Sequence, residues 1–285
     1  SSEATTGDLV SMMVGREMKE RFPKRESNVG EEVLRVEHLQ VENPYAPGKL
    51  RIQDASFELH RGEVLGIAGL MGAGRTELVT SVFGEYGTIV GGQIYMHGKP
   101  IRIASARDAM ANRISLVPED RKAQGLVVIQ SIVKNVALPN MDQFSGFGYI
   151  NRHKEVAESR RYAQSLRIKA PSLETVVNQL SGGNQQKVVI SKWLMSNPEV
   201  LILDDPTRGI DVGAKFEIYK LINRLAGEGV AIIMISSELE EVLGMCDRVM
   251  VMSEGRTTGA LKVSEATQEK IMTLATMARE TAEAT

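Results

Sequence analysis

Short hydrophobic runs recur along this chain, and each run is bounded by polar residues. Residues 33–39 and 52–59 alternate hydrophobic and polar positions, as strands with one buried face do. Other runs are hydrophobic at most positions, which is typical of strands covered on both faces of a parallel sheet. These runs lie at 64–68, 113–117, 200–203, 230–235 and 247–252. The pattern predicts an α/β fold with a mainly parallel core sheet.

Helical periodicity marks several of the intervening segments. Residues 76–83 are predicted to form a helix directly after a glycine-rich turn. Hydrophobic residues at i, i+3, i+4 and i+7 predict another helix before the strand at 230–235. They are Ile218, Leu221, Ile222 and Leu225. The stretch from 127 to 179 lacks strand–helix alternation and includes the charged, helical segment 151–166, so we expect an inserted, mainly helical subdomain over 127–195.

The two ends differ from this pattern. Residues 1–31 are expected to form a tail, with a short amphipathic helix at 9–18 and a charged, Pro-containing linker at 20–28. A nucleotide-binding domain is expected over 32–258, and a terminal helix from Ser264 to Ala278 within a C-terminal segment, 259–285. The chain begins without an initiator Met, so we interpret it as a piece of a longer protein.

Composition narrows the class of protein. The formal net charge of −2 implies no broad attraction to nucleic acid. A single cysteine excludes an internal disulfide and a four-cysteine zinc site. Hydrophobic runs fall short of the roughly 20 residues that span a bilayer, and the sequence shows no signal peptide. We therefore expect a cytoplasmic setting.

A phosphate-binding loop is the first chemical motif. Gly69-Leu70-Met71-Gly72-Ala73-Gly74-Arg75-Thr76 matches G-x-x-x-x-G-K-[ST], except that Arg75 replaces the lysine. Glycines allow successive N–H groups to converge on phosphate oxygens, and the following helix N-terminus, which includes Glu77, favours an anion. Thr76 can ligate Mg²⁺. Arginine keeps the positive charge but replaces a compact ammonium with a planar guanidinium. We therefore expect the substitution to disturb ATP hydrolysis more than phosphate binding. The alternative is a glycine-rich turn that binds nothing.

The strand at 200–203 ends in two acids. Asp204 is predicted to hold Mg²⁺ through its water shell, and Asp205 stands where an ATPase needs a base for the attacking water. Aspartate is one methylene shorter than glutamate, and a misplacement of about 1 Å can cost roughly a hundredfold in rate. Asp205 is therefore a poor catalytic base. The alternative is a plain strand terminus with a turn.

A third motif opens a predicted helix. Its residues are Leu180, Ser181, Gly182, Gly183, Asn184 and Gln185, within LSGGNQQK. A serine at the N-cap, followed by two glycines, leaves backbone N–H groups open to a phosphate. The alternative is an ordinary capped helix.

The three motifs, in this order, resemble those of the ATP-binding cassette (ABC) family over residues 32–252. The segments GAGRT at 72–76, VPEDRK at 117–122, LSGGNQQK at 180–187 and PTRGIDVG at 206–213 are similar to the second cassette of tandem bacterial monosaccharide-importer ATPases, of the ribose, xylose and galactose type. This resemblance implies a P-loop NTPase fold with an antiparallel β subdomain and a helical subdomain. It also implies that this chain is the C-terminal half of such a protein.

The resemblance assigns further roles by position. Tyr45 matches the residue that stacks on adenine, although a surface-loop residue is an equal alternative. Asp211 falls in the D-loop, the segment that follows the acidic strand end. Glu119 stands at the glutamine-loop position and is a candidate metal ligand, and Ser237 replaces the switch histidine. Second cassettes of this group carry Arg, Glu and Ser at three of these positions but usually keep glutamate where Asp205 stands.

The family implies a function shared between cassettes. ABC cassettes work as head-to-tail pairs, in which each ATP lies between the phosphate loop of one and the signature of the other. The implied cofactors are ATP and Mg²⁺. The implied partners are an N-terminal cassette or second ABC subunit, a membrane permease docked near 119–147 and, indirectly, an external sugar-binding protein. The implied location of this chain is the cytoplasmic face of the bacterial inner membrane. We expect this chain to have a degenerate site of its own and to complete the partner's site.

Three other functions remain open at this stage. An autonomous P-loop ATPase or kinase would not explain the signature. A cassette protein acting on DNA or ribosomes would be expected to carry coiled coils, zinc cysteines or basic arms. A regulatory ABC module would bind nucleotide without a permease.

Overall fold

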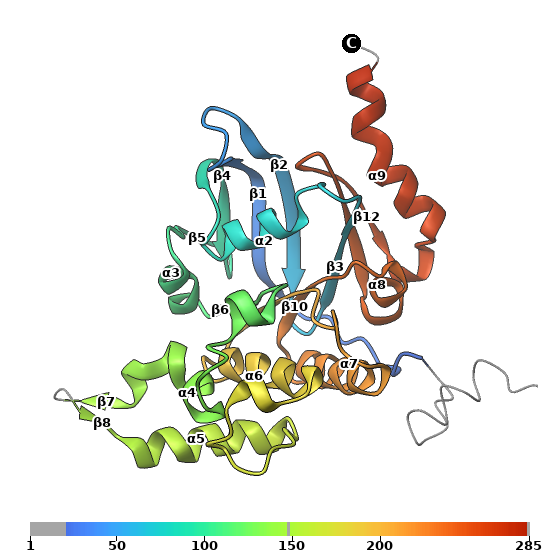
Figure 1. The fold of residues 1–285 in the computed structure, drawn as a ribbon. Coiled ribbons are helices and arrows are strands. Elements are labelled where there is room, and N and C mark those ends of the chain that lie inside the picture. The colour runs from blue at the N-terminus through green and yellow to red at the C-terminus, as the bar shows by residue number, and fades with distance from the viewer. Residues whose placement is uncertain (1–20, 147–148, 284–285) are drawn as a thin grey trace, which may run out of the picture.

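A ten-stranded sheet organises the chain (Figure 1). The computed structural model describes residues 21–146 and 149–283. The strand order is β5-β4-β1-β2-β12-β11-β3-β10-β9-β6. Five parallel strands form its core: β3 (Val64–Gly69), β6 (Ile114–Val117), β9 (Val200–Asp204), β10 (Ala231–Ile235) and β11 (Arg248–Ser253).

Antiparallel strands extend this core at one edge. They are β1 (Glu32–Glu42), β2 (Leu50–His60), β4 (Thr88–Met96) and β5 (Lys99–Ile101). β12 (Arg256–Lys262) runs antiparallel to β11 and joins the two parts through one bridge to β2, between Arg256 and Asp54. The predicted α/β class is therefore confirmed, with a mainly parallel core and an antiparallel part.

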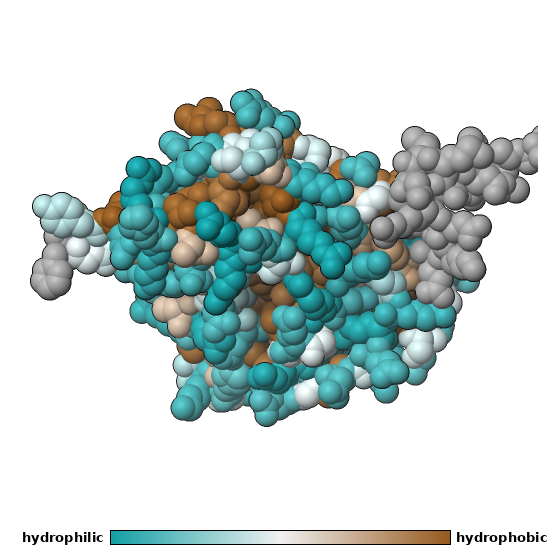
Figure 2. Space-filling view, turned by 90° about the horizontal axis from the view of Figure 1, so that it is seen from below, coloured by the Kyte–Doolittle hydropathy of each residue, from teal (hydrophilic) through white to brown (hydrophobic). Residues whose placement is uncertain are grey.

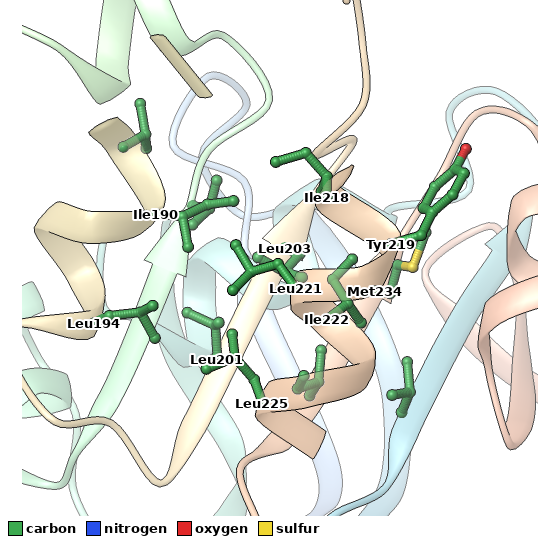
Figure 3. Packing of buried hydrophobic residues seen from close by; sticks show 14 of the residues in the cluster. Ile190, Leu194, Leu201, Leu203, Ile218, Tyr219, Leu221, Ile222, Leu225 and Met234 are labelled. Carbon is green, nitrogen blue, oxygen red and sulfur yellow. The ribbon is translucent and has the colours of Figure 1, made fainter. Parts of the chain in front are cut away.

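Helices cover the two faces of the core sheet. Alternate residues of a strand point to opposite faces, and the buried side chains separate into two clusters accordingly. Leu65 and Ile67 of β3 pack with α2 (Arg75–Val82) and α3 (Ala106–Ala111). Val64 and Ala68 of the same strand belong to the cluster of the other face. That cluster includes α6 (Gly182–Leu194), α7 (Val212–Gly227), α8 (Leu239–Met245) and α9 (Gln268–Glu283), and Figure 3 shows its packing between α6, α7 and the strands.

The region between β6 and β9 is mainly helical. Its regular elements are η1 (Arg121–Gly125), α4 (Ile132–Ala137), η2 (Leu138–Gln143), β7 (Ser145–Gly146), β8 (Tyr149–Ile150), α5 (Arg152–Ser165), η3 (Val177–Gln179) and α6. A salt bridge between Lys134 and the buried Glu155, at 2.8 Å, joins α4 to α5. Asn151 caps α5 by accepting a hydrogen bond from the Lys154 N–H, so the helix begins where its charge pattern predicts. Within the described residues, every helix is too short or too polar to cross a membrane.

Several element boundaries differ from the predictions. Arg113 has φ of 59° and lies outside β6. The terminal helix begins at Gln268, because Val263–Glu265 form a 3₁₀ turn, η4, ahead of it. The predicted division at 258 falls inside β12.

Among the elements that were not predicted are β4, β12 and α3. β4 contains Gly91 and Gly92, β12 contains few hydrophobic residues, and the helix α3 is short. None of these elements carries a strong hydrophobic repeat.

The N-terminal tail is described in part. The helix predicted at 9–18 lies outside the described residues. Residues 21–30 form no helix or strand, but they contact the folded domain. The ring of Phe22 lies 5.3 Å from that of Tyr219, and Arg25 pairs with Asp247.

Candidate nucleotide-binding site

The glycine-rich loop connects β3 to α2, as its motif predicts. Gly72 and Gly74 have φ of 82° and 99°, which favour glycine. A side chain at Gly69 would lie 2.5 Å from the carbonyl oxygen of Met252, whereas Gly72 has open space around it. The loop thus exposes backbone at the N-terminus of α2, with Glu77 in the first turn. This geometry fits the phosphates of ATP.

Asp204 lies at the end of β9, near this loop. Its side chain is 1% exposed, and among the described residues neither carboxylate oxygen has a hydrogen bond of ordinary geometry, although the Thr76 hydroxyl lies close to it. Burial raises its pKa to about 6, against the lowering effects of the nearby Thr76 hydroxyl and Arg75. An unpaired buried carboxylate beside a hydroxyl is a suitable donor set for a hydrated Mg²⁺. Thr76 and Asp204 would hold that ion, which would supply positive charge against the phosphates.

Arg75, Asp205 and Ser237 are brought together from three distant segments. The Asp205 Oδ1 accepts hydrogen bonds from the Ser237 N–H at 2.7 Å and from the Ser237 hydroxyl at 2.9 Å. The Arg75 guanidinium donates to the Ser236 carbonyl at 3.2 Å. Asp205 has φ of 44°, a conformation that non-glycine residues seldom adopt. Arg75 stands where a cation is expected to contact the phosphates, Asp205 where the catalytic base is expected and Ser237 where the switch residue is expected. These three residues therefore form one cluster.

The signature forms a second, separate cluster. Ser181 is the N-cap of α6 but gives that helix no side-chain cap; its hydroxyl accepts from the Asn184 amide at 3.0 Å. Gly183 is buried against Ala214, whose Cβ would lie 2.5 Å from an added Cβ. Asp211 caps α7 by accepting from the Ala214 N–H at 2.9 Å. The signature and the D-loop residue thus share one surface, and the first N–H groups of α6 stay open.

The helices that carry these two motifs pack on opposite faces of the sheet. Leu78 and Val79 of α2 pack in one hydrophobic cluster, whereas Val188 and Val189 of α6 pack in the other. The sheet therefore separates the helices that carry the phosphate loop and the signature. These two motifs of one chain do not face each other.

Glu119 and Arg121 connect the clusters through the segment after β9. The Glu119 carboxylate pairs with the Arg208 guanidinium. Arg121 donates to the carbonyls of Arg208 at 2.6 Å and Gly209 at 3.1 Å. Glu119 thus forms an ion pair with Arg208, and its metal role stays a prediction.

Tyr45 lies in the turn between β1 and β2, and its side chain is 87% exposed. The turn is closed by a hydrogen bond from the Tyr45 N–H to Asn43 Oδ1 at 2.9 Å. An exposed ring fits both base stacking and a surface loop. Near the phosphate loop, Arg51 and Glu77 form a salt bridge at 2.6 Å that the sequence did not indicate.

Glu241 is a buried acid that the sequence analysis missed. Burial by itself would raise its pKa, but hydrogen bonds from Tyr219, Thr207, Lys215 and Ser236 lower the pKa overall. One signal was available: Glu241 lies four residues before the buried Met245, on the hydrophobic side of α8.

Comparisons with known proteins agree with this geometry. The ABC transporter family matches residues 52–208. "Xylose import ATP-binding protein XylG" of Thermoanaerobacter pseudethanolicus is 52% identical over 95% of this chain and 54% of that protein. "L-arabinose transport ATP-binding protein AraG" of Geobacillus stearothermophilus is 47% identical over 96% of this chain and 54% of that protein. The chain therefore spans about half the length of these relatives.

Solved structures share the fold. A nucleotide-free ATP-binding cassette from an ABC transporter has a TM-score of 0.71 at 21% identity, covering 85% of this chain and 94% of that one. CbiO1 from Clostridium perfringens, part of the ABC transporter complex cbiONQ, has a TM-score of 0.69 at 27% identity, covering 87% and 96%.

Proposed function

Since this chain belongs to the ABC transporter family, we propose that it is the C-terminal cassette of a bacterial monosaccharide-importer ATPase. The identity to relatives named for xylose and arabinose transport supports the substrate class. Their greater length leaves room for a preceding cassette. We place the end of the nucleotide-binding domain after β12 rather than at 258, because that strand belongs to the sheet.

One observation carries this proposal: α2, which follows the phosphate loop, and α6, which begins at the signature, pack on opposite faces of the sheet. A single chain cannot enclose one ATP between them. Two cassettes in head-to-tail arrangement can, because each then offers its signature to the phosphate loop of the other. The open N–H groups of α6 at Ser181 and Gly182 would contact the phosphates bound by the partner cassette, with Asp211 beside them.

The chain's own site would bind nucleotide with little turnover. Arg75 supplies charge to phosphates from a guanidinium that already bonds to the Ser236 carbonyl. Asp205 accepts two hydrogen bonds from Ser237, which leaves it less available to orient a water. An unengaged glutamate and a histidine would be better placed for that task. Magnesium would be held by Thr76 and Asp204.

The helical end of the molecule is proposed to dock on a membrane permease at the cytoplasmic face of the inner membrane. Figure 2 shows this end with a mainly hydrophilic surface interrupted by hydrophobic residues. Exposed large hydrophobic residues of this region are Val127, Ile129, Leu138, Tyr149 and Ile150. Sugar selectivity would reside in the permease and an external sugar-binding protein.

The isolated chain tests this division of labour. We expect it to bind ATP with Mg²⁺, seen as a thermal shift that Arg75→Ala removes. Its turnover should be at least about a hundredfold below that of the assembled importer, as misplaced catalytic groups predict. Hydrolysis by the isolated chain at the rate of the assembled importer would contradict the proposal.

A further inference from the structure

The acid Glu241 joins three segments that surround the site. Its side chain is 1% exposed, and its carboxylate accepts hydrogen bonds from four other side chains. The Thr207 hydroxyl lies 2.7 Å from both oxygens, the Tyr219 hydroxyl 2.6 Å from Oε1, the Ser236 hydroxyl 2.8 Å from Oε2 and the Lys215 ammonium 3.0 Å from Oε1. These donors come from the segment after β9, from α7 and from the end of β10. A buried carboxylate with this many donors is fully satisfied, and truncating it would leave them unpaired.

Two of these donors are adjacent to functional segments. Ser236 directly precedes Ser237, which bonds to Asp205, and its carbonyl accepts from Arg75. Thr207 lies between Asp205 and the D-loop residue Asp211. Glu241 therefore connects the phosphate-loop cluster to the segment that leads to the signature surface.

The remaining donors anchor Glu241 to the fold. Figure 3 shows Tyr219 at the edge of the hydrophobic cluster, with its oxygen directed away from the aliphatic side chains. Phe22 lies against the Tyr219 ring, and the adjacent Arg21 pairs with Glu240. Lys215 also bonds to Glu238, at 2.5 Å. The carboxylate is thus fixed from α7, so it can hold Thr207 and Ser236 at a set separation.

We propose that Glu241 is a positioning residue that ties the Ser236–Ser237 segment to the Thr207–Asp211 segment, so that a change at the chain's own nucleotide site moves its D-loop. It would act through these segments, because its carboxylate bonds only to side chains of this chain within the described residues. Its effect on turnover rests on the proposed function, because the D-loop acts on the site completed with the partner cassette. Its effect on the two segments is independent of that function.

The first test uses the isolated chain and hydrogen exchange. Glu241→Ala should speed exchange on the order of tenfold at 205–211 and 235–238, and leave that of α3 unchanged. Glu241→Gln should have a smaller effect, since its oxygen still accepts from Tyr219 and Thr207. Glu240→Gln, on the exposed side of the same helix, is the matched control. Unchanged exchange in both segments would overturn the proposal. If Glu241→Ala does not fold, Glu241→Gln and Thr207→Val decide the result.

The second test uses the assembled importer, at a temperature where every variant is folded. Glu241→Ala should lower kcat at least about tenfold with KM for ATP within twofold, and Glu241→Gln should restore part of kcat. A merely structural residue would leave kcat of the folded variant unchanged. Ser181→Ala is the reference for the proposed function. If it slows turnover and Glu241→Ala does not, the inference is wrong and the function stands. If Ser181→Ala has no effect, the function is wrong, and hydrogen exchange alone decides the inference.

Discussion

The carboxylate of Asp204 combines a cost to folding with a proposed role in holding Mg²⁺. It is buried with no hydrogen bond of ordinary geometry among the described residues, and burial raises its pKa from 3.8 to about 6 in spite of the nearby Thr76 hydroxyl. An acid whose pKa is higher in the folded chain favours folding when it is protonated. This stabilisation is therefore present below about pH 3.8 and is lost as the pH rises through about 6.

The size of the effect follows from the shift. About two pKa units correspond to about 3 kcal/mol, at 1.36 kcal/mol per unit. Asp204→Asn removes the charge and keeps the shape, so we expect the free energy of unfolding at pH 7.5 to rise by up to about 3 kcal/mol. About half of that gain should disappear between pH 7.5 and pH 5, because wild-type Asp204 becomes protonated there in the folded state.

Urea unfolding followed by the fluorescence of Trp193 measures this difference at several pH values, without Mg²⁺ or nucleotide. Asp142→Asn, at an exposed carboxylate in η2, is the control and should show no such gain. MgATP should stabilise the wild type more than Asp204→Asn, because the variant loses a ligand to the ion. A variant no more stable than the wild type at pH 7.5, or a difference that does not change with pH, would refute the reasoning.

Three further predictions concern the phosphate loop, the proposed adenine contact of Tyr45 and the N-terminal segment. Gly69→Ala should cost about 1–3 kcal/mol of stability and abolish ATP binding, because its Cβ would meet a backbone oxygen; an unchanged melting temperature in a thermal-shift assay would contradict this. Tyr45→Ala should weaken ATP binding by about 1–3 kcal/mol in calorimetry with little change in stability, and an unchanged Kd would make it a plain loop residue. Phe22→Ala should lower the free energy of unfolding by about 1–3 kcal/mol, and equal stability would show that residues 21–25 do not pack on Tyr219 in solution.

The local parts of this site could be predicted from the sequence. The loop at 69–76 and the helix start at 181 depend on glycine and capping chemistry within a few residues. Elements without a strong repeat could not be predicted: β12 has few hydrophobic residues, and β4 contains two consecutive glycines.

Contacts between distant segments were beyond the sequence. Arg75 and Ser236 are 161 residues apart, and nothing local indicates that a guanidinium would reach that carbonyl. Glu119 pairs with Arg208 across 89 residues, and nothing local in the sequence indicates that pairing. Glu238, Glu240 and Glu241 are close together in the sequence, but only Glu241 is buried. Its position on α8 faces Thr207 and Tyr219.

Ser181→Ala in the assembled importer tests the central claim most directly. Ser181 gives α6 no side-chain cap and is exposed, so the variant should fold with nearly unchanged stability. If the signature of this chain closes the partner's ATP site, turnover and sugar uptake should both fall at least about tenfold, as loss of a phosphate contact predicts. Full ATP turnover and uptake by a stably folded Ser181→Ala importer would contradict the account.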